Sequence, residues 1–534
     1  MSNFIVADTE DDSAELLKAG KSGFDKKVTQ IAALTDDGAS FYNQGNVKEF
    51  LKWLKLRPEN RIYFHNLQYD LGNLFGDELD KLDVTLVGGR IIKATWGNKI
   101  FLDSFNIWPM ALKKIGLAFG MEKRETDSMA HDKEYVFQDV KILQKAMQFV
   151  WSFVEENNLT HCPSTLGGLC VLYWKHLAGE NCHDSNEICR KAYYGGRVEL
   201  FKKVNEADNI AYTDINSLYP SMMLKRYPDR LEIQNDLTEY GVATVTMQVP
   251  KCDLAPLPFR CEDGKILYPY GKFTGTWTIF EIREAEKRGA KILNVHEVMG
   301  TNHYMEPYTK FVNNLYELRQ GSKSEAERLF WKLLLNNLYG RLGTSGKIGR
   351  SVWANEKNIW EGTPYGEKVL VEYSLPLSDE TNWSHAAYVT SYARICLLEF
   401  MEKVGATNMI YCDTDSTIFD CANKQLPFPV SMKLGEMKLE SWETSCETFA
   451  PKMYRTGKKY KAKGVPVKHA EKFITQGHAE FELPFKMREA ISFYDRGNKK
   501  KLSVWRQVQK FNRKIYDKKI FKNNRFYPCK INRV

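Results

Sequence analysis

The chain has 534 residues, of which 43% are hydrophobic and 27% are charged. This composition excludes a disordered chain, a collagen-like repeat and a disulfide scaffold, and the length suffices for several domains. The formal net charge of +9 is unevenly distributed, since residues 496–534 hold 14 Lys and Arg and one Asp, whereas residues 1–495 are slightly acidic. Such a basic end, interspersed with aromatic residues, predicts a folded element that contacts a polyanion.

Neither a membrane span nor a signal peptide is expected. No apolar run reaches 18 residues, and the N-terminus lacks a basic flank followed by an apolar stretch. The 11 scattered cysteines fit a reducing compartment. One stretch has zinc-binding residue types but no CxxC pair, so reduced structural thiols are the favoured interpretation. It contains His161, Cys162, Cys170, His176, Cys182, His183 and Cys189.

Along the chain, residues 1–150 alternate short apolar runs (FIVA, RIYFHNL, IFLDSF) with helical stretches, which predicts an α/β region. The polar, turn-rich residues 157–168 predict a domain boundary, after which a second α/β region begins. Residues 346–384 have short alternating runs divided by Gly and Pro. They predict a β-hairpin insertion.

Carboxylates in the first half have the spacing of a metal site. Asp8 and Glu10 follow FIVA, and strand alternation puts both on one side. Asp70 ends the run IYFHNLQYD, while Tyr135 and Asp139 lie one helical turn apart on a shared face. Each acid alone could lie on the surface. Four acids with a Tyr hydroxyl instead favour a two-metal site at which water attacks.

A second group of carboxylates lies in the other half. Asp214 ends a short apolar strand in AYTDINSLYP, where Tyr219 opens a helix, and a strand-end carboxylate suits a hard cation. NMIYCDTDSTIF predicts a strand–turn–strand hairpin in which Asp413 and Asp415 point the same way. An acidic surface turn is the alternative, but the apolar flanks argue against it. Packed side by side, the two segments would place three acids around one point, which divalent cations would neutralise.

Between these segments, the sequence predicts a helix over 324–340. Ser324 and Glu327 form a capping box, and Gly340 suits a C-terminal stop. One face carries Arg328, Lys332, Asn336 and Tyr339. Two cations, an amide and an aromatic ring suit a nucleoside triphosphate, although an amphipathic helix with a basic edge has the same pattern.

With these motifs in this order, nearly the whole chain resembles the family B DNA polymerases. Within them it resembles the protein-primed enzymes of bacteriophages and linear plasmids. DTE, HNLQYD and YVFQD resemble the three exonuclease motifs, while DINSLYP, KLLLNNLYG and YCDTDS resemble polymerase motifs. YYGG resembles a linker motif that touches the template, TSYAR a template-binding motif, and KMY a motif that holds the primer end.

The resemblance implies an α/β and α+β multidomain fold. A ribonuclease-H-like exonuclease domain would span about 1–160, and a right-hand polymerase domain about 161–534. The latter divides into a palm (185–227 and 386–482), an insertion contacting the terminal protein (228–310), fingers (311–343), a hairpin insertion (344–385) and a thumb (483–534). The hairpin insertion would help to encircle DNA, and the basic thumb would grip duplex phosphates without reading sequence.

The resemblance also implies residue roles. Asp214 and Asp415 would bind the polymerisation metals with Asp413 close by, the Ile215 carbonyl would be a further ligand, and Tyr219 would exclude a 2′-hydroxyl. Asp8, Glu10, Asp70 and Asp139 would bind the exonuclease metals, with Tyr135 orienting water. Arg328, Lys332, Asn336 and Tyr339 would bind the nucleotide; the second phosphate-binding cation stays open among Arg319, Lys323 and Arg328. Asn66, Tyr193, Gly195, Gly196, Thr390, Arg394, Lys452 and Tyr454 would contact DNA.

The implied activity is that of a DNA-dependent DNA polymerase with 3′–5′ proofreading. It would act as a monomer with primer–template DNA, dNTPs, a terminal protein as primer and two Mg²⁺ or Mn²⁺ ions per site. It would replicate a linear viral or plasmid genome with strand displacement in the host cytoplasm, without a membrane partner. The alternatives are an RNA-primed family B polymerase and a nuclease or DNA-binding protein with an inactive polymerase half.

Overall fold

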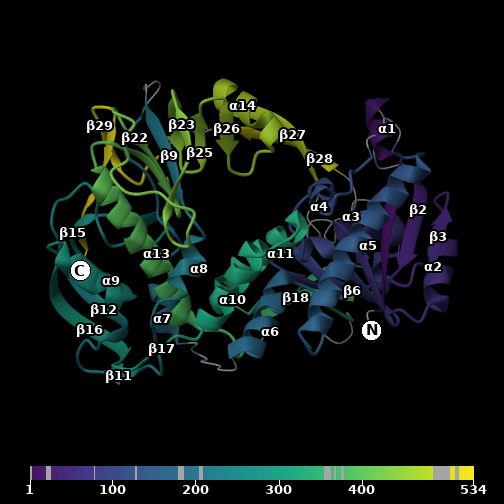
Figure 1. Ribbon diagram of the computed structural model, residues 1–534, viewed down its shortest axis with the longest axis horizontal. Coiled ribbons are helices and arrows are strands. Elements are labelled where there is room, and N and C mark those ends of the chain that lie inside the picture. Colours follow the sequence, from purple (N-terminus) through teal and green to yellow (C-terminus); the bar gives the residue numbers. More distant parts are fainter. Residues whose placement is uncertain are drawn as a thin grey trace.

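The computed structural model of the chain describes residues 3–19, 26–76, 78–124, 126, 129–178, 184, 186–203, 209–344, 346–353, 362–365, 368–374, 378–484, 505–511 and 516–533. Three large sheets organise these residues, and we call them the N-terminal, central and insertion sheets. The N-terminal sheet lies on one side of the molecule, and the other two lie on the opposite side (Figure 1). No helix among the described residues has the length and apolarity needed to cross a membrane.

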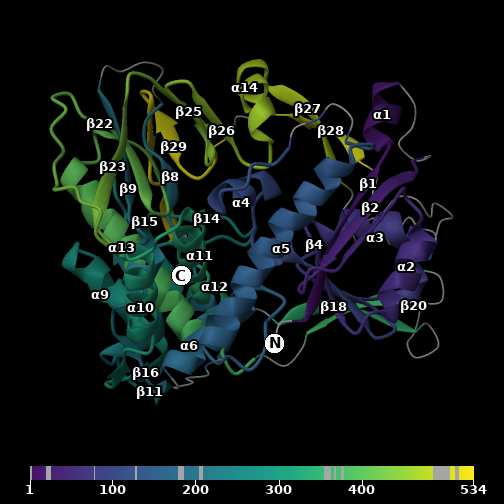
Figure 2. The same cartoon turned by 45° about the vertical axis from the view of Figure 1, so that its right-hand side comes forward.

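The N-terminal sheet has ten strands, and its alternating side chains pack on both faces. On β1, Phe4 and Val6 belong to the core beneath helix α5, whereas Ile5 and Ala7 belong to the core beneath α2 and α3. Figure 2 shows α5 and α2 on opposite sides of this sheet. The strand order is β19 (Gly362–Tyr365), β20 (Lys368–Ser374), β18 (Lys347–Trp353), β5 (Asp83–Val87), β6 (Arg90–Trp96), β7 (Lys99–Asp103), β4 (Arg61–Phe64), β1 (Phe4–Asp11), β2 (Val28–Thr35) and β3 (Ser40–Asn43). The helices are α1 (Ser13–Lys18), α2 (Val47–Leu56), α3 (Leu67–Phe75), α4 (Leu112–Ala118) and α5 (Lys133–Glu156).

The predicted hairpin insertion is present and joins a distant sheet. Strands β18 and β20 pair antiparallel, and β18 also pairs with β5, where Gly349 lies opposite Leu86. The insertion thus extends the sheet of the chain's first half. The predicted boundary at 157–168 also falls on a connection, because α5 ends at Glu156 and α6 begins at Leu166.

The central sheet contains the predicted strand–turn–strand hairpin. Strands β21 and β22 pair antiparallel, and β22 also pairs with β9. The apolar residues Ile210, Ala211 and Ile215 of β9 are buried. The order is β23 (Met437–Glu443), β9 (Ile210–Ile215), β22 (Ser416–Asp420), β21 (Met409–Asp413) and β8 (Val198–Leu200). Helices α8 (Leu218–Met222) and α13 (Trp383–Val404) pack against each other beside it.

The insertion sheet contains a strand from the end of the chain. Its order is β11 (Glu232–Gln234), β16 (Lys291–Thr301), β12 (Tyr240–Val249), β15 (Tyr270–Thr278) and β31 (Lys530–Arg533), with α9 (Ile279–Lys287) packed against it. Because β31 pairs in parallel with β15, the last residues of the predicted thumb add a strand to the insertion sheet, and residues 485–504 and 512–515 of that thumb lie outside the described residues. The preceding ribbon, β27 (His478–Pro484) and β28 (Trp505–Phe511), extends toward the N-terminal sheet (Figure 1).

The predicted helix over 324–340 is broken in two. Helix α11 (Glu325–Leu335) ends before α12 (Leu338–Leu342), and Gly340 lies inside α12 rather than at a stop. The side chains of Asn336 and Asn337 donate to the carbonyls of Lys332 and Leu333, at 2.7 and 2.8 Å. These bonds compete with the main-chain pattern and explain the break. Helices α6 (Leu166–Ala178) and α10 (Thr309–Gln320) pack on α11.

Smaller elements complete the described fold. They are α7 (Glu187–Ala192), β10 (Tyr227–Pro228), β13 (Phe259–Arg260), β14 (Ile266–Leu267), β17 (Tyr304–Met305), β24 (Cys446–Ala450), β25 (Met453–Thr456), β26 (Lys459–Ala462), α14 (Val467–Gln476), β29 (Ile520–Lys522) and β30 (Arg525–Tyr527).

Candidate active sites

The first-half acids form what we call the N-terminal carboxylate site, made of Asp8, Glu10, Asp70 and Asp139. Strand alternation points Asp8 and Glu10 from β1 toward α5, which carries Asp139 and the buried Tyr135. One oxygen from each of Asp8, Glu10 and Asp139 lies within 4.8 Å of the other two. Within the described part of the chain, no other three His, Cys, Asp or Glu ligands lie so close.

Crowding of buried negative charges changes the proton affinity of these acids. Burial, and then the Asp139 charge, raise the pKa of Asp8 to about 7. Burial, and then the Asp8 charge, raise the pKa of Glu10 to about 9. Burial also raises the pKa of Asp139, although Lys123 opposes the shift. Carboxylates that repel one another in this way suit a hard divalent cation, which would stabilise their ionised forms.

The fourth acid, Asp70, lies on α3 and contacts Thr9, the residue between Asp8 and Glu10. Its Oδ1 accepts hydrogen bonds from the Thr9 main-chain N and from Thr9 Oγ1, at 3.1 and 2.8 Å. Within the described residues, Asp70 Oδ2 and Asp139 Oδ1 are buried without a hydrogen-bond partner. Buried oxygens normally have partners, so these two atoms fit the requirements of a bound cation.

Lys123 belongs to the same site, and sequence reasoning missed it. Its Nζ lies 2.5 Å from Asp139 Oδ2 and 4.6 Å from the centre of the Tyr135 ring. The residue lies in the connection between α4 and α5, within the charged run EKRET. Nothing in that run distinguishes a site cation from a solvated one, so only the tertiary structure identifies it.

The second group forms the central carboxylate site, made of Asp214, Asp413 and Asp415. Asp214 on β9 lies opposite Ser416 of β22, and Ile215 N donates to Asp415 O at 2.7 Å. Thr414 has a left-handed backbone, with φ of 63°, which makes the tight turn between the other two acids. The pairing of β9 with β22 therefore brings Asp214 next to the turn that carries Asp415, so the two segments lie side by side as predicted.

The three central acids are gathered less tightly than expected: within the described residues, their oxygens do not form a group in which all three lie within 4.8 Å of one another. Asp413 instead binds Lys452 Nζ, at 2.7 and 2.9 Å from its two oxygens, and accepts from Tyr411 OH at 3.2 Å. Asp214 Oδ1 lies 3.5 Å from Lys438 Nζ. These lysines neutralise the outer acids, so the carboxylates have partners besides one another.

Asp415 retains a raised pKa of about 6, through burial first and the Asp214 charge second. Burial likewise raises the pKa of Asp214, while Lys438 and Lys332 oppose the shift. The site therefore combines two partly buried acids with cations from other segments. This donor set fits divalent ions held by oxygen ligands.

Two aromatic rings and a glycine lie against the turn of the central site. The rings of Tyr219 and Tyr339 lie 4.2 Å apart between centroids. A Cβ on Gly196 would lie 2.7 Å from Thr414 side-chain atoms and 2.9 Å from Tyr219 OH. Glycine is therefore needed at 196 for the YYGG segment to approach the turn. Tyr193 packs against Gly343, which follows α12.

The candidate phosphate-binding cations differ in their surroundings. Arg319 Nη1 donates to Ser217 Oγ at 3.3 Å, in the turn that leads to Tyr219. Arg328 is exposed and lies 3.5 Å from Glu325, whereas Lys332 influences the pKa of Asp214. The break after Leu335 also divides the predicted helix face. Lys332 lies on α11, Asn336 in the break and Tyr339 on α12.

The two predicted DNA contacts on helix α13 are buried. Thr390 and Arg394 are each 1% exposed. Arg394 binds both oxygens of Glu281, each at 2.8 Å, and donates to the carbonyls of Tyr194 and Gly195, at 2.8 and 3.0 Å. Arg394 thus fixes the YYGG segment from inside the protein, and any influence on DNA would pass through that segment.

The remaining predicted contacts differ in their exposure. Asn66 is exposed and left-handed at the start of α3, and its N–H donates to Asp103 Oδ1 at 2.9 Å. Tyr454 is buried beside Tyr411. In the Cys/His-rich stretch, Cys170 Sγ donates to Leu334 O at 3.3 Å, and residues 182 and 183 lie outside the described residues.

Comparisons with known proteins agree with the motifs. Residues 122–417 match the family described as DNA polymerase type B, organellar and viral. The DNA-directed DNA polymerase of Enterobacteria phage PRD1 is 26% identical over 444 residues, covering 78% of this chain and 76% of that protein. A probable DNA polymerase of Ascobolus immersus is 28% identical over 301 residues, covering 51% of this chain but only 24% of that longer protein.

A solved structure shares the fold. The DNA polymerase of Bacillus phage phi29, in complex with primer–template DNA and incoming nucleotides, matches with a TM-score of 0.70 and 16% sequence identity. The match covers 95% of this chain and 99% of that one. This likeness confirms the predicted multidomain α/β and α+β fold.

Proposed function

The chain belongs to the type B DNA polymerases of the organellar and viral group, and from this membership we propose separate tasks for its carboxylate sites. The central carboxylate site adds deoxynucleotides to a primer on a DNA template, and the N-terminal carboxylate site removes them from the 3′ end. The observation that supports polymerisation most strongly is the hydrogen bond from Ile215 N to Asp415 O, which holds Asp415, in the turn before β22, beside Asp214 near the end of β9.

In polymerisation, the primer 3′-hydroxyl attacks the α-phosphate of a dNTP and pyrophosphate leaves. Enzymes of this family generally use divalent metal ions, and we propose Mg²⁺, held by Asp214, Asp415 and the Ile215 carbonyl. Bound Mg²⁺ supplies positive charge for the oxygens of the reacting phosphate. Lys332 and Arg319 orient the triphosphate through charge-assisted hydrogen bonds.

Tyr219 is suited to select the sugar. Its ring packs on Tyr339, and its hydroxyl is confined by the close approach of Gly196. A ring fixed on two sides cannot move away from a 2′-hydroxyl, so a ribonucleotide would clash. We propose that this contact favours dNTPs.

Proofreading would use the other site. Asp8, Glu10 and Asp139 present converging oxygens, and the unpaired oxygen of Asp70 completes the ligand set. Tyr135 would orient the attacking water. Lys123 holds Asp139 and the Tyr135 ring in place, so it would fix that orientation.

Initiation is proposed to use a hydroxyl of a terminal protein, which the resemblance to protein-primed polymerases supports. The insertion sheet is the proposed contact for that protein, the host cytoplasm the proposed location, and the monomer the proposed form. Incubation with labelled dNTP and the genome's own end-bound protein should transfer dNMP to that protein. Initiation only from RNA ends would contradict protein priming.

Primer extension tests both tasks. The purified chain, with Mg²⁺ and a primed single-stranded template, should extend a matched primer and should first remove a mismatched 3′ end. Extension without mismatch removal would contradict the proposed proofreading but not the proposed polymerisation. Failure to extend the matched primer would contradict the polymerase role of the central site.

A further inference from the structure

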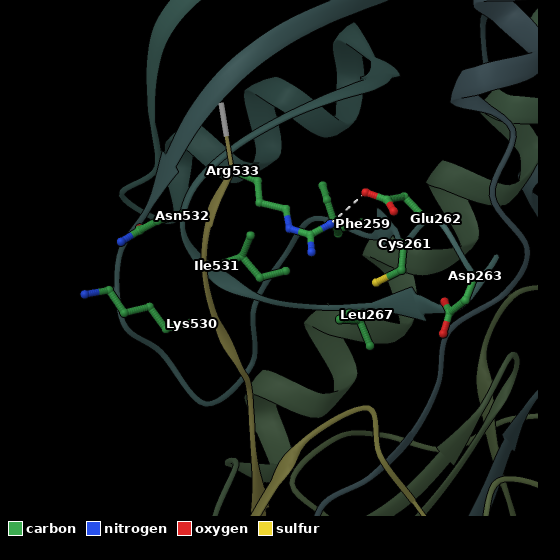
Figure 3. A pocket seen from close by; sticks show the side chains of 9 residues that line it. All are labelled: Phe259, Cys261, Glu262, Asp263, Leu267, Lys530, Ile531, Asn532 and Arg533. Carbon is green, nitrogen blue, oxygen red and sulfur yellow. Dashed lines mark hydrogen bonds and ion pairs between the residues drawn. The ribbon is translucent and has the colours of Figure 1, made fainter.

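The C-terminal segment, residues 516–533, bridges the central and insertion sheets. Phe526 N donates to Phe201 O, and Lys203 N donates to Asn524 O, both at 2.9 Å, just after β8. At its other end β31 pairs with β15, and Arg533 contacts Glu262 at 3.2 Å (Figure 3). The segment thus covers the edge of the sheet that carries the central carboxylate site.

Lys519 is the buried cation of this segment. It is 6% exposed, whereas Lys522 and Lys530 are exposed. Its Nζ lies 3.1 Å from Glu199 Oε1 and 3.5 Å from the centre of the Phe201 ring. A lysine that leaves water needs a charged partner, and here Glu199 on β8 is that partner.

Glu199 holds a second buried cation, Arg197. Arg197 Nε donates to Glu199 Oε2 at 2.5 Å, and Nη1 donates to Ala255 O at 3.0 Å. Its guanidinium also lies 4.1 Å from the centre of the Tyr268 ring. Burial alone would raise the pKa of Glu199, but Arg197 and Lys519 hold it below its ordinary value. The carboxylate therefore binds both cations in its ionised form.

The main chain of Arg197 reaches the central site. Its carbonyl accepts the Thr414 N–H at 2.7 Å. Thr414 is the left-handed residue between Asp413 and Asp415, and it also contacts Gly196 closely. Any shift of Arg197 would therefore move the turn that orients these two acids.

We propose that Lys519 is a positioning residue for nucleotide addition. Its ion pair with Glu199 fixes Arg197, and the Arg197 carbonyl fixes the turn of the central site. The inference rests on the proposed polymerase function of that site. Without Lys519, one Glu199 oxygen is left buried and unpaired, and Glu199 and Arg197 would reorient together.

The test compares Lys519→Met with Lys519→Arg in the full chain. Displacements of about an ångström can cost up to about a hundredfold in rate, so we expect Lys519→Met to lower kcat for single-nucleotide addition about tenfold or more. The KM for dNTP should change little, and the Mg²⁺ concentration for half-maximal addition should rise. Exonuclease activity on single-stranded DNA, measured on the same preparation, should stay unchanged. Lys519→Arg should restore most of kcat.

Lys265→Met is the matched control. Lys265 lies between β13 and β14, and its substitution removes an exposed ion pair to Asp517 of the C-terminal segment, at 2.7 Å; surface pairs contribute little. If Lys519→Met does not fold, Glu199→Asp tests the proposal in its place. This variant keeps the negative charge but moves the carboxylate away from Lys519, so the same loss of kcat is expected. Unchanged kcat and Mg²⁺ dependence, or a parallel loss of both activities, would overturn the proposal. If the wild-type protein itself adds no nucleotides, this result would instead contradict the proposed polymerase function.

Discussion

The two carboxylate sites hold their acids in different ways. In the N-terminal site, Asp8, Glu10 and Asp139 face one another, and only Asp139 has a lysine partner among its described contacts. In the central site, Asp413 and Asp214 contact lysines of their own. The first site is thus assembled around a space for cations, whereas cations entering the second compete with Lys452 and Lys438.

The difference follows from the supporting elements. The N-terminal acids come from a strand and from helices on both faces of its sheet, and burial, followed by the Asp8 charge, raises the pKa of Glu10 to about 9. The central acids come from one sheet and the adjoining turn, where strand spacing separates them and the pKa of Asp415 rises only to about 6. Proton release should therefore accompany metal binding more strongly at the N-terminal site.

The largest effect expected on exonuclease activity comes from Glu10→Gln. Loss of one ligand charge should lower exonuclease activity by about a thousandfold, equivalent to roughly 4 kcal/mol, because metal ions supply several kcal/mol of charge stabilisation. Primer extension should remain at the wild-type rate. Glu134→Gln, an exposed acid on the same helix as Asp139, is the control for both assays. Equal loss of both activities would break the distinction between the sites.

Lys123→Met should produce the next largest effect. Removing the partner of Asp139 leaves both Asp139 and Tyr135 less constrained, and we expect exonuclease activity to fall about thirtyfold. Degradation of a labelled single strand measures this, with the exposed Lys141→Met as control. Wild-type degradation by the variant would contradict a positioning role of Lys123 toward Asp139 and Tyr135.

Gly196→Ala should affect the central site alone. The added Cβ would overlap Thr414 and the Tyr219 hydroxyl, so the turn must shift. We expect nucleotide addition to slow about tenfold or more, with exonuclease activity retained. Gly195→Ala meets open space and should have a smaller effect. Equal slowing by both variants would mean that flexibility, not close approach, requires the glycines.

The two candidate cations should differ in nucleotide binding. Arg319→Ala should raise the KM for dNTP about tenfold, which corresponds to about 1.4 kcal/mol. Arg328→Ala should raise it less than about threefold, because an exposed cation paired with Glu325 offers little. Steady-state titration with dNTP measures both. The reverse order would favour the interpretation drawn from helical spacing.

The smallest expected effect is on stability. The pKa of Glu10 is about 9 in the folded protein, against an ordinary value of 4.5, so the folded state binds this proton more tightly. Its stabilising contribution is complete below the ordinary pKa and is lost as the pH rises through the folded pKa. In EDTA the melting temperature should therefore fall between about pH 5 and pH 9, less steeply for Glu10→Gln. Equal slopes would contradict this.

The sequence predicted the parts of these sites that local patterns determine. Alternation in FIVADTE put Asp8 and Glu10 on one face, and the apolar flanks of DTD predicted its hairpin. The sequence could not identify Lys123 or Lys519 as site residues. The local sequence around a lysine in a charged run does not differ between a solvated side chain and one buried in the fold. The sequence also did not predict the helix break at Asn336. Asn side chains that bond to the main chain leave the helical spacing of the other residues unchanged.

The basic C-terminus was the least predictable region. Its charge suggested one surface for a polyanion, yet residues 516–533 join two sheets and bury Lys519. Pairing of β31 with β15 connects residues far apart in the chain, and no local pattern encodes such a contact. For the same reason, the packing of the hairpin insertion on β5 was not foreseen.

Separate chemistry at the two sites is tested most directly with Asp415→Asn. The variant and the wild type would be given Mg²⁺, dNTPs and a primed template with a mismatched 3′ end. Wild type should remove the mismatch and extend the primer. The variant should remove the mismatch at the wild-type rate and extend the primer at least about a thousandfold more slowly. Unchanged extension by Asp415→Asn would contradict polymerisation at the central carboxylate site.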